Sequence, residues 1–297
     1  MKKLTKEEFV ERADKVHNYK YNYDSFEFIN SKYVSYIKCE EHGFFKKSMY
    51  FHINKRQGCP LCVKKELNNY DHNLVIDNNF SYMIGLFQTD GTMSKFERNR
   101  GKFLLSLSVK DSDIIYKIKD IIPYNYKISN RIKHTKFKRD NKIYEYHNEI
   151  ITYCVMNQFF RNFLFENGIP YGKKSKIINI PKSEKLSKYD YIRGLLDGDG
   201  SLGFTKKGFP YIGFVTESDD MKFFIIDFIS EITGKDRKVN NRNKRDNIYN
   251  IVIYKEDAIR FCELVYYENC LSINRKYEAA RNIINWKRPI EMKNRNY

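Results

Sequence analysis

From residue 79 onward, the hydrophobic and polar positions follow one succession of helical and strand-like patterns twice. Apolar residues recur at helical spacing in some stretches and alternate with polar residues in others. In the first copy we predict four strands and a closing helix, near 91–98, 102–109, 126–137, 143–154 and 156–167. In the second copy we predict four strands and two helices, near 200–206, 209–216, 236–244, 247–254, 256–267 and 273–285. Ser112 and Ser218 stand where a side-chain oxygen would cap each middle helix. The succession predicts an α+β fold built from two similar halves.

Two short motifs show the repetition in the letters themselves. YMIGLFQTDG (82–91) shares its Tyr, Gly, Leu, Asp and final Gly in register with YIRGLLDGDG (191–200). Downstream, VKDSD (109–113) matches VTESD (215–219) at nearly the same separation. Two landmarks at matching offsets indicate an internal duplication of the chain.

Each of the first pair of motifs carries small residues four positions apart, Gly85 and Thr89 in one copy and Gly194 and Gly198 in the other. Residues at this spacing share one helix face, and small ones let two helix backbones come close. A glycine inside a helix costs about 1 kcal/mol relative to alanine, so its repeated use indicates that close approach is needed. We therefore expect the two helices to pack side by side.

The acidic residue near the end of each motif gives this packing a chemical meaning. Parallel helices would bring Asp90 and Asp199 together at their negative, C-terminal ends. Neighbouring carboxylates repel unless a cation binds them, and oxygen ligands suit Mg²⁺. We predict about two or three Mg²⁺ ions at this junction, since such ions hydrolyse phosphodiesters by activating water and stabilising the leaving oxygen. The alternative is that DGDG only ends a helix and turns the chain.

The charge of the chain points to a polyanionic partner. Its 54 Lys and Arg residues outnumber 37 acidic ones, for a formal net charge of +17, and cations that neutralise phosphates release counterions. With 41% hydrophobic residues the chain can form a sizeable core. No apolar run approaches a membrane span, so we expect no membrane partner. We expect an intracellular, reducing setting (bacterial or phage-infected cytoplasm, with an organelle as the alternative), where cysteines serve as thiols or metal ligands.

At these motifs the chain resembles the LAGLIDADG homing endonucleases, in the single-chain form with two motifs per polypeptide. The resemblance covers about 79–285 and includes the later stretches GIPYGKKSKIINIP and LSINRKYEAA. It implies an αββαββα fold for each half, a pseudo-twofold axis, and a saddle of strands that lies in the DNA major groove. It also implies that Asp90 and Asp199 bind the catalytic metal. Gln88 replaces the first acidic residue of its motif whereas Asp197 keeps it, which indicates that the two half-sites are not equivalent.

Alternation along the predicted saddle strands assigns basic and polar residues to one face. In the first copy, Ile128 and Ile132 are expected to face the helices. The residues predicted to contact DNA from the opposite faces are Lys127, Arg131 and Lys133 in the first copy and Lys238, Asn240, Arg242 and Lys244 in the second. Arg and Lys can pair with guanine edges, and Asn with adenine. The alternative is a solvated edge strand whose charges prevent aggregation.

Three further residues are candidates for catalysis. Lys174 and Lys276 resemble the basic residues that flank the active site in this family. Such a lysine can stabilise developing phosphorane charge or orient water. Gln88 stands beside the metal end of its helix, where it could position water. The alternative for both lysines is a surface position in a lysine-rich chain.

The N-terminal region differs from the rest because its cysteines come in metal-ligand spacing, Cys39-x2-His42 and Cys59-x2-Cys62. Paired thiolate and imidazole ligands suit one structural, tetrahedral Zn²⁺, which would fix a segment with little core of its own. Reduced cysteines packed as apolar groups are the alternative, and His52 is an alternative ligand. The stretch before the first pair resembles zinc-ribbon-like modules attached to phage and mobile-element endonucleases, which implies a tethered DNA-binding arm.

Together these patterns predict four segments: a zinc-ribbon-like module (1–67), a linker (68–78) and two LAGLIDADG halves (79–180 and 181–297). The predicted function is that of a monomeric, Mg²⁺-dependent endonuclease that cuts both strands of a long DNA target, as in the homing of an intron. One alternative is an intron maturase that binds intron RNA on the same scaffold. The other is a DNA-binding regulator without cleavage, against which the presence of both motif aspartates counts.

Overall fold

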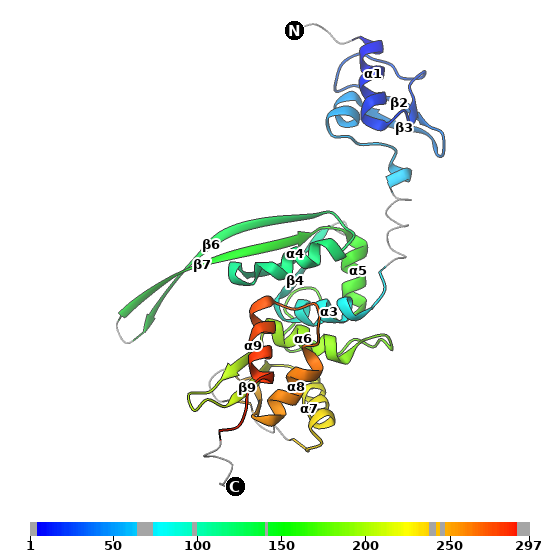
Figure 1. Ribbon diagram of the computed structural model, residues 1–297. Helices are drawn as coiled ribbons and strands as arrows, with labels where there is room; N and C mark the ends of the chain where they lie inside the picture. Colours follow the sequence, from blue (N-terminus) through cyan, green and yellow to red (C-terminus); the bar gives the residue numbers. More distant parts are fainter. Residues whose placement is uncertain are drawn as a thin grey trace. The chain divides into compact units, whose positions relative to one another are not determined.

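The computed structural model describes residues 5–63, 74–96, 100–139, 142–237, 242–243 and 247–289. Its contacts divide the chain into two compact units, Met1–Leu74 (unit 1) and Val75–Tyr297 (unit 2), which follow each other along the sequence colours of Figure 1. Within the described ranges, no helix is long and apolar enough to cross a membrane.

Unit 1 is a small antiparallel sheet, in the order β1-β2-β3, with a helix packed on one face. Its elements are α1 (Lys6–His17), β1 (Tyr21–Asn22), β2 (Val34–Cys39), β3 (Gly43–Ser48) and the π-helical turn η1 (Tyr50–Asn54). A capping box starts α1: the Thr5 hydroxyl accepts from the Glu8 N–H, and the Glu8 carboxylate accepts from the Thr5 N–H. Phe9 of α1 then packs against Ile37 and Phe45 on the inner face of the sheet.

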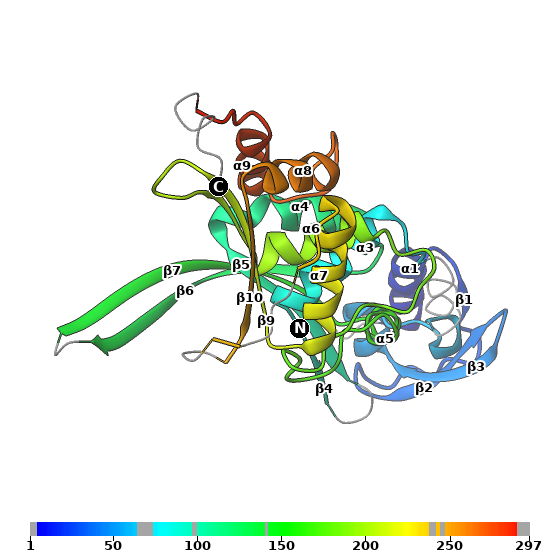
Figure 2. The ribbon, with the colours of Figure 1, turned by 90° about the horizontal axis from the view of Figure 1, so that it is seen from below.

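The first copy of the repeat, in unit 2, is a four-stranded antiparallel sheet in the order β4-β5-β7-β6. Its elements are α3 (Asn78–Asp90), β4 (Gly91–Lys95), β5 (Gly101–Ser108), η3 (Val109–Asp111), α4 (Ser112–Ile121), β6 (Tyr126–Arg139), β7 (Lys142–Val155) and α5 (Gln158–Glu166). Strands β6 and β7 run out together as a long hairpin (Figure 2). The predicted strands are confirmed, but the predicted cap Ser112 is wrong. Ser112 is the first residue of α4, because the short 3₁₀ turn η3 precedes it and is capped by Ser108.

The second copy follows a similar order, with one described strand after its middle helix and one helix more at its end. Its elements are α6 (Lys188–Gly198), β8 (Ser201–Phe204), β9 (Pro210–Thr216), α7 (Asp219–Thr233), β10 (Tyr249–Tyr254), α8 (Glu256–Val265) and α9 (Asn274–Ile284). Its sheet has the order β10-β9-β8. Ser218 caps α7 as predicted, accepting from the Met221 N–H at 3.2 Å. Of the predicted strand 236–244, the four described residues are not in a strand, and the others lie outside the described residues.

Helices α3 and α6 pack side by side where the two copies meet (Figures 1 and 2). A Cβ atom on Gly85 would lie 2.2 Å from the carbonyl oxygen of Tyr191, and one on Gly194 would lie 2.1 Å from that of Tyr82. These separations are far below van der Waals contact, so only glycine fits at either position. The predicted close approach of the two backbones is confirmed, and it brings the C-terminal ends of α3 and α6 together.

Candidate active site

Two carboxylates meet at the ends of α3 and α6. Asp90 is the last residue of α3, and Asp199 follows Gly198 at the end of α6. A Cβ atom on Gly198 would lie 2.7 Å from Oδ2 of Asp90, so that carboxylate lies against the last turn of the facing helix. Burial and the charge of Asp199 raise the pKa of Asp90 to about 6. Surrounding protein atoms partly desolvate Asp199 and raise its pKa as well, while Lys174 and Lys276 act in the opposite direction.

Lys174 and Lys276 occupy equivalent places beside these carboxylates. The Lys174 ammonium donates to the carbonyls of Phe87 (2.8 Å) and Gly91, at the end of α3. Lys276 donates to the matching carbonyls of the second copy, Leu196 (3.1 Å) and Gly200 (2.6 Å). A cation there offsets the negative end of each helix. Burial lowers the pKa of both lysines, that of Lys174 to about 8, against the opposing effect of nearby carboxylates.

The lysines are therefore not ordinary surface residues. Lys276 is only 5% exposed, and Lys174 is partly buried. Each ammonium group donates to two main-chain carbonyls, so it is fixed at the end of a motif helix instead of extending into solvent. This placement agrees with the predicted neighbourhood of the carboxylates, while the catalytic role of both residues stays a prediction.

Gln88 does not point at the carboxylates, which corrects the prediction that it positions water. It is 1% exposed, and its amide nitrogen donates to the carbonyls of Gly168 and Asn179, both at 2.9 Å. Its oxygen accepts from the hydroxyl of Tyr191 at 2.5 Å. With both amide hydrogens and the oxygen engaged, Gln88 ties α3 to the second copy and to the chain between the copies.

Asp197, at the position equivalent to Gln88, is also a buried anchor that joins the two copies. It accepts hydrogen bonds from the Tyr82 hydroxyl (2.7 Å), the Tyr266 hydroxyl (2.6 Å) and the Ile273 N–H (2.7 Å). Three donors suit a carboxylate, whereas Gln88 faces two carbonyls and therefore needs an amide. Burial raises the pKa of Asp197 against these hydrogen bonds, which lower it. The difference between the two copies thus lies in structural anchors, because Asp90 and Asp199 are the same residue in both.

The sequence of this half matches a known family. Residues 77–163, from α3 into α5, match the family described as the LAGLIDADG-like domain. The first copy is a LAGLIDADG-like domain. Residues 2–63, in unit 1, match a family described as a protein of unknown function (DUF723). No curated protein matches the sequence.

Solved structures with similar coordinates include LAGLIDADG proteins. The meganuclease I-SmaMI bound to uncleavable DNA is 11% identical with a TM-score of 0.42, over 68% of this chain and 88% of that one. The homing endonuclease I-WcaI bound to its DNA recognition sequence is 13% identical with a TM-score of 0.43, over 74% and 92%. The N-terminal LAGLIDADG domain of DUF199/WhiA is 12% identical with a TM-score of 0.39, over 72% and 94%.

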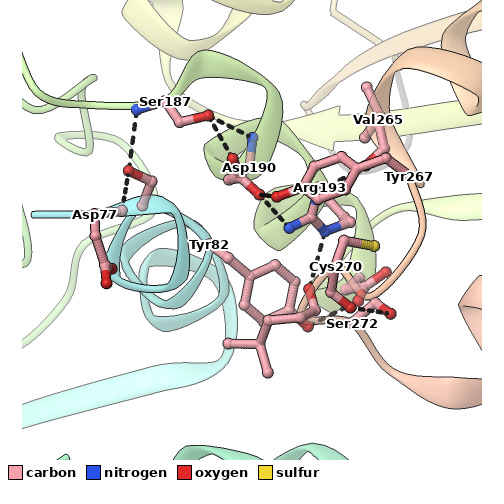
Figure 3. Close-up of polar contacts among 12 residues, drawn as sticks. Asp77, Tyr82, Ser187, Asp190, Arg193, Val265, Tyr267, Cys270 and Ser272 are labelled. Atoms are coloured by element: carbon pink, nitrogen blue, oxygen red, sulfur yellow. Dashed lines mark hydrogen bonds and ion pairs between the residues drawn. The ribbon is translucent and has the colours of Figure 1, made fainter. Parts of the chain in front are cut away.

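A buried ion pair fixes the second motif helix, α6, to the chain that follows α8 in the same copy (Figure 3). Arg193 is fully buried and pairs with Asp190, one turn earlier in α6. Its guanidinium also donates to the carbonyls of Val265 (2.7 Å) and Leu271 (2.9 Å), in the chain that leads to α9. The Tyr267 hydroxyl donates to Asp190 at 2.6 Å. Removing one partner would leave a buried charge unpaired, so this cluster holds α6 firmly in place.

A second ion pair joins the LAGLIDADG-like domain to the other copy. Arg275, next to Lys276, donates from two nitrogens to both carboxylate oxygens of Asp111, one of them at 2.8 Å. Asp111 is 7% exposed, whereas the Arg275 side chain is 52% exposed, so this bidentate pair is buried on its acidic side only. A cavity of about 220 Å³ lies beside Lys174 and Asp199 and extends to Glu217. The surroundings of the two carboxylates therefore differ.

The register of the β6–β7 hairpin places Lys127, Arg131 and Lys133 on the sheet face opposite the helices, as predicted. They pair across the strands with Cys154, Ile150 and Asn148, and all three are exposed. Their contact with DNA stays a prediction. The expectation for Ile132 is wrong: it is 57% exposed, because the hairpin continues beyond the helices that cover Ile128.

Arg242 is the one predicted DNA contact of the second copy that falls among the described residues. Its guanidinium lies 4.6 Å from the centre of the Tyr249 ring, 3.4 Å from a carboxylate oxygen of Asp219, and 3.2 Å from the carbonyl of Asn247. These contacts hold it against α7 and β10. The predicted contacts Lys238, Asn240 and Lys244 lie outside the described residues.

The four predicted zinc ligands of unit 1 converge. The ligand atoms of Cys39, His42, Cys59 and Cys62 all lie within 4.8 Å of one another. The Cys39 and Cys62 sulfurs are 3.5 Å apart, and Nδ1 of His42 lies 3.3 Å from the Cys62 sulfur. Three buried thiols and one imidazole at these distances fit a tetrahedral Zn²⁺. The alternative that the cysteines only fill a core leaves their convergence on His42 unexplained.

His52, the alternative ligand, is committed elsewhere. Its two ring nitrogens contact the Tyr23 hydroxyl (2.9 Å) and the Gln57 carbonyl (2.8 Å). Burial lowers its pKa to about 4, which keeps the ring neutral. His52 is thus a core histidine.

Tyr82 and Tyr191 were not predicted as site residues, yet each connects one motif helix to the polar anchor of the other. The sequence does hold a signal for them. Both tyrosines stand at the same position of the two motif copies, eight residues before Asp90 and Asp199. A tyrosine repeated on an otherwise apolar helix indicates that its hydroxyl has a buried partner.

Proposed function

We propose that this protein is a metal-dependent, sequence-specific DNA endonuclease that makes a double-strand break. The observation that carries the proposal is the meeting of Asp90 and Asp199, one from each copy, between two lysines anchored on the same helix ends. A carboxylate pair of this kind is unfavourable by itself, and burial together with the charge of Asp199 raises the pKa of Asp90. It becomes favourable when cations bind.

The donors at this site fit Mg²⁺. Asp90 and Asp199 supply hard carboxylate oxygens, and no described cysteine or histidine lies with them to favour a softer metal. When bound, the metal would supply an activated water and charge for the leaving oxygen. Asp90 and Asp199 would hold it, and Gly198 keeps the two carboxylates close enough to share it.

We infer that the two lysines act on the DNA backbone. An ammonium has three N–H donors, and in each lysine two of them go to helix-end carbonyls. No described residue takes the third, so it can reach a phosphate oxygen or an attacking water. With its pKa lowered to about 8, Lys174 can also exchange a proton near neutral pH.

The rest of the chain supports DNA binding. The exposed face of the β6–β7 hairpin, with Lys127, Arg131 and Lys133, would lie along the duplex, and unit 1 would act as a tethered arm. One structural Zn²⁺ on Cys39, His42, Cys59 and Cys62 would hold that arm together. The net charge of +17 suits such a partner.

A cleavage selection tests the proposal. The purified protein is incubated with a randomised duplex library and Mg²⁺, and cut molecules are sequenced. Asp90→Asn and Asp199→Asn should each abolish double-strand cleavage, because the metal needs both carboxylates. Asp220→Asn, an exposed acid on α7, should not.

Three results would reject the proposal: cleavage without divalent cation, cleavage that survives both active-site substitutions, and the absence of any cut. If structured RNA is bound and no DNA is cut, the protein is better described as a maturase.

A further inference from the structure

The outer face of the unit 1 sheet carries exposed aromatic rings between lysines. Tyr36 on β2 and Phe44 on β3 are 48% and 58% exposed. Tyr36 pairs across the strands with Lys46, and Phe44 pairs with Lys38. Each aromatic ring therefore has a lysine as its neighbour on the opposite strand. The two rings meet edge to face at 6.4 Å, and the Lys46 nitrogen lies 4.9 Å from the centre of the Tyr36 ring.

This outer face is not needed for the core of unit 1. The alternate residues of the same strands, Ile37, Cys39 and Phe45, point inward and pack with α1. Helix α1, which covers the inner face of the sheet, carries acidic and basic side chains together, and its Glu11 pairs with Lys15. The outer side presents Lys38 and Lys46, and the exposed Glu40 lies 3.8 Å from Lys38. Such an exposed pair is weak and would yield to a phosphate.

We propose that this face binds single-stranded DNA, with unpaired bases stacked on Tyr36 and Phe44 and phosphates held by Lys38 and Lys46. Aromatic platforms flanked by lysines bind single strands because every base has a flat face and every nucleotide a negative charge. In a duplex, neighbouring bases cover those faces, and groove edges are read by hydrogen-bonding side chains instead. The inference rests on the proposed role of unit 1 as a DNA-binding arm.

Binding titrations of the full chain test this inference. Asp199→Asn serves as the background to prevent cleavage, and chelators are left out so that Zn²⁺ stays bound. The probes are a fluorescein-labelled DNA strand of about 12 nucleotides, the duplex of the same sequence, and the RNA strand, each followed by anisotropy.

We expect Tyr36→Ala/Phe44→Ala to weaken binding to the DNA strand at least about tenfold and to leave duplex binding unchanged. Tyr36→Phe keeps the ring and should keep the affinity. Lys46→Ala should lower the salt dependence of strand binding by about 0.7 in its logarithmic slope. The matched control is Phe223→Ala on α7, whose ring is 56% exposed with the Lys222 nitrogen 3.9 Å from its centre, and it should change nothing.

Three outcomes would overturn the inference: unchanged strand binding by the double variant, an equal loss on strand and duplex, and tighter binding of RNA than of the DNA strand. The zinc content and circular dichroism of each variant show that unit 1 is folded. Failure of the proposed nuclease function would appear in the cleavage assay of the wild-type chain. It would leave these titrations readable, because they use a variant that does not cut.

Discussion

Replacing Gly194 by alanine tests whether the close packing of α3 and α6 sets the position of the two carboxylates. The new Cβ atom would lie 2.1 Å from the carbonyl oxygen of Tyr82 and 2.8 Å from the main-chain nitrogen of Leu86. Both are backbone atoms of the facing helix, so no side chain can rotate away. Normal contact needs about 3.5 Å, and the helices must therefore move apart by about 1 Å.

The size of the effect follows from two opposing contributions. Overpacking a tight interface costs roughly 1–3 kcal/mol of unfolding free energy, or more. Alanine in a helix regains about 1 kcal/mol relative to glycine. Because the clash is with backbone atoms, the upper part of the overpacking range, roughly 2–3 kcal/mol, applies. We therefore expect a net loss of about 1–2 kcal/mol, which for a domain of this size lowers Tm by roughly 2–8 °C. Activity should suffer more, because a displacement of about 1 Å between reacting groups can cost about 100-fold in rate.

Thermal unfolding and single-turnover cleavage of the same preparations separate the two effects. Lys188→Ala, at the exposed start of α6, is the control for a change of helix propensity without a close contact. A Gly194→Ala protein that melts and cuts like wild type would refute the reasoning that close approach places the carboxylates. A folded variant with little cleavage would support it.

Other predictions concern the carboxylates and unit 1. Burial and Asp199 raise the pKa of Asp90 from 3.8 to about 6, so protonation of Asp90 stabilises the folded protein when no metal is bound. The unfolding free energy of the metal-free protein, measured in denaturant titrations, should rise as pH falls from about 7 to 5, and Asp90→Asn should reduce that rise. An unfolding free energy that does not change over this pH range would contradict the raised pKa. Cys62→Ser should release the zinc, measured with a colorimetric chelator, and unfold unit 1, whereas Cys270→Ser should keep the zinc. Deleting 1–67 should weaken DNA binding and raise the off-target share of cleavage, and unchanged binding and cutting would reject the arm.

The sequence predicts most of the fold of unit 2 because its pattern is strong and repeated. Alternation places the first four strands within a few residues, and the spacing of Gly85 with Thr89 and of Gly194 with Gly198 predicts the helix pair directly. The same reasoning fails where the environment decides. Alternation cannot say how far the covering helices reach, so Ile132 was expected to be covered and is exposed.

The site shows the same division. Asp90 and Asp199 are predictable because the duplication puts them in register at helix ends. Gln88 is not, since its role depends on two carbonyls, of Gly168 and Asn179, that come from distant parts of the chain. An amide near a metal site is compatible with holding water and with holding backbone, and only the partners distinguish the two.

The crossed hydrogen bonds of the motif helices have a consequence for the history of the chain. Tyr82 of the first copy meets Asp197 of the second, and Tyr191 of the second meets Gln88 of the first. After a gene duplication, the tyrosine of each copy therefore depends on a hydrogen-bonding partner in the other copy. Exposed strand residues can change independently of one another, but these four positions must change together. A chimera that takes one motif helix from another parent should therefore take the facing motif helix from the same parent, so that both tyrosines keep their partners.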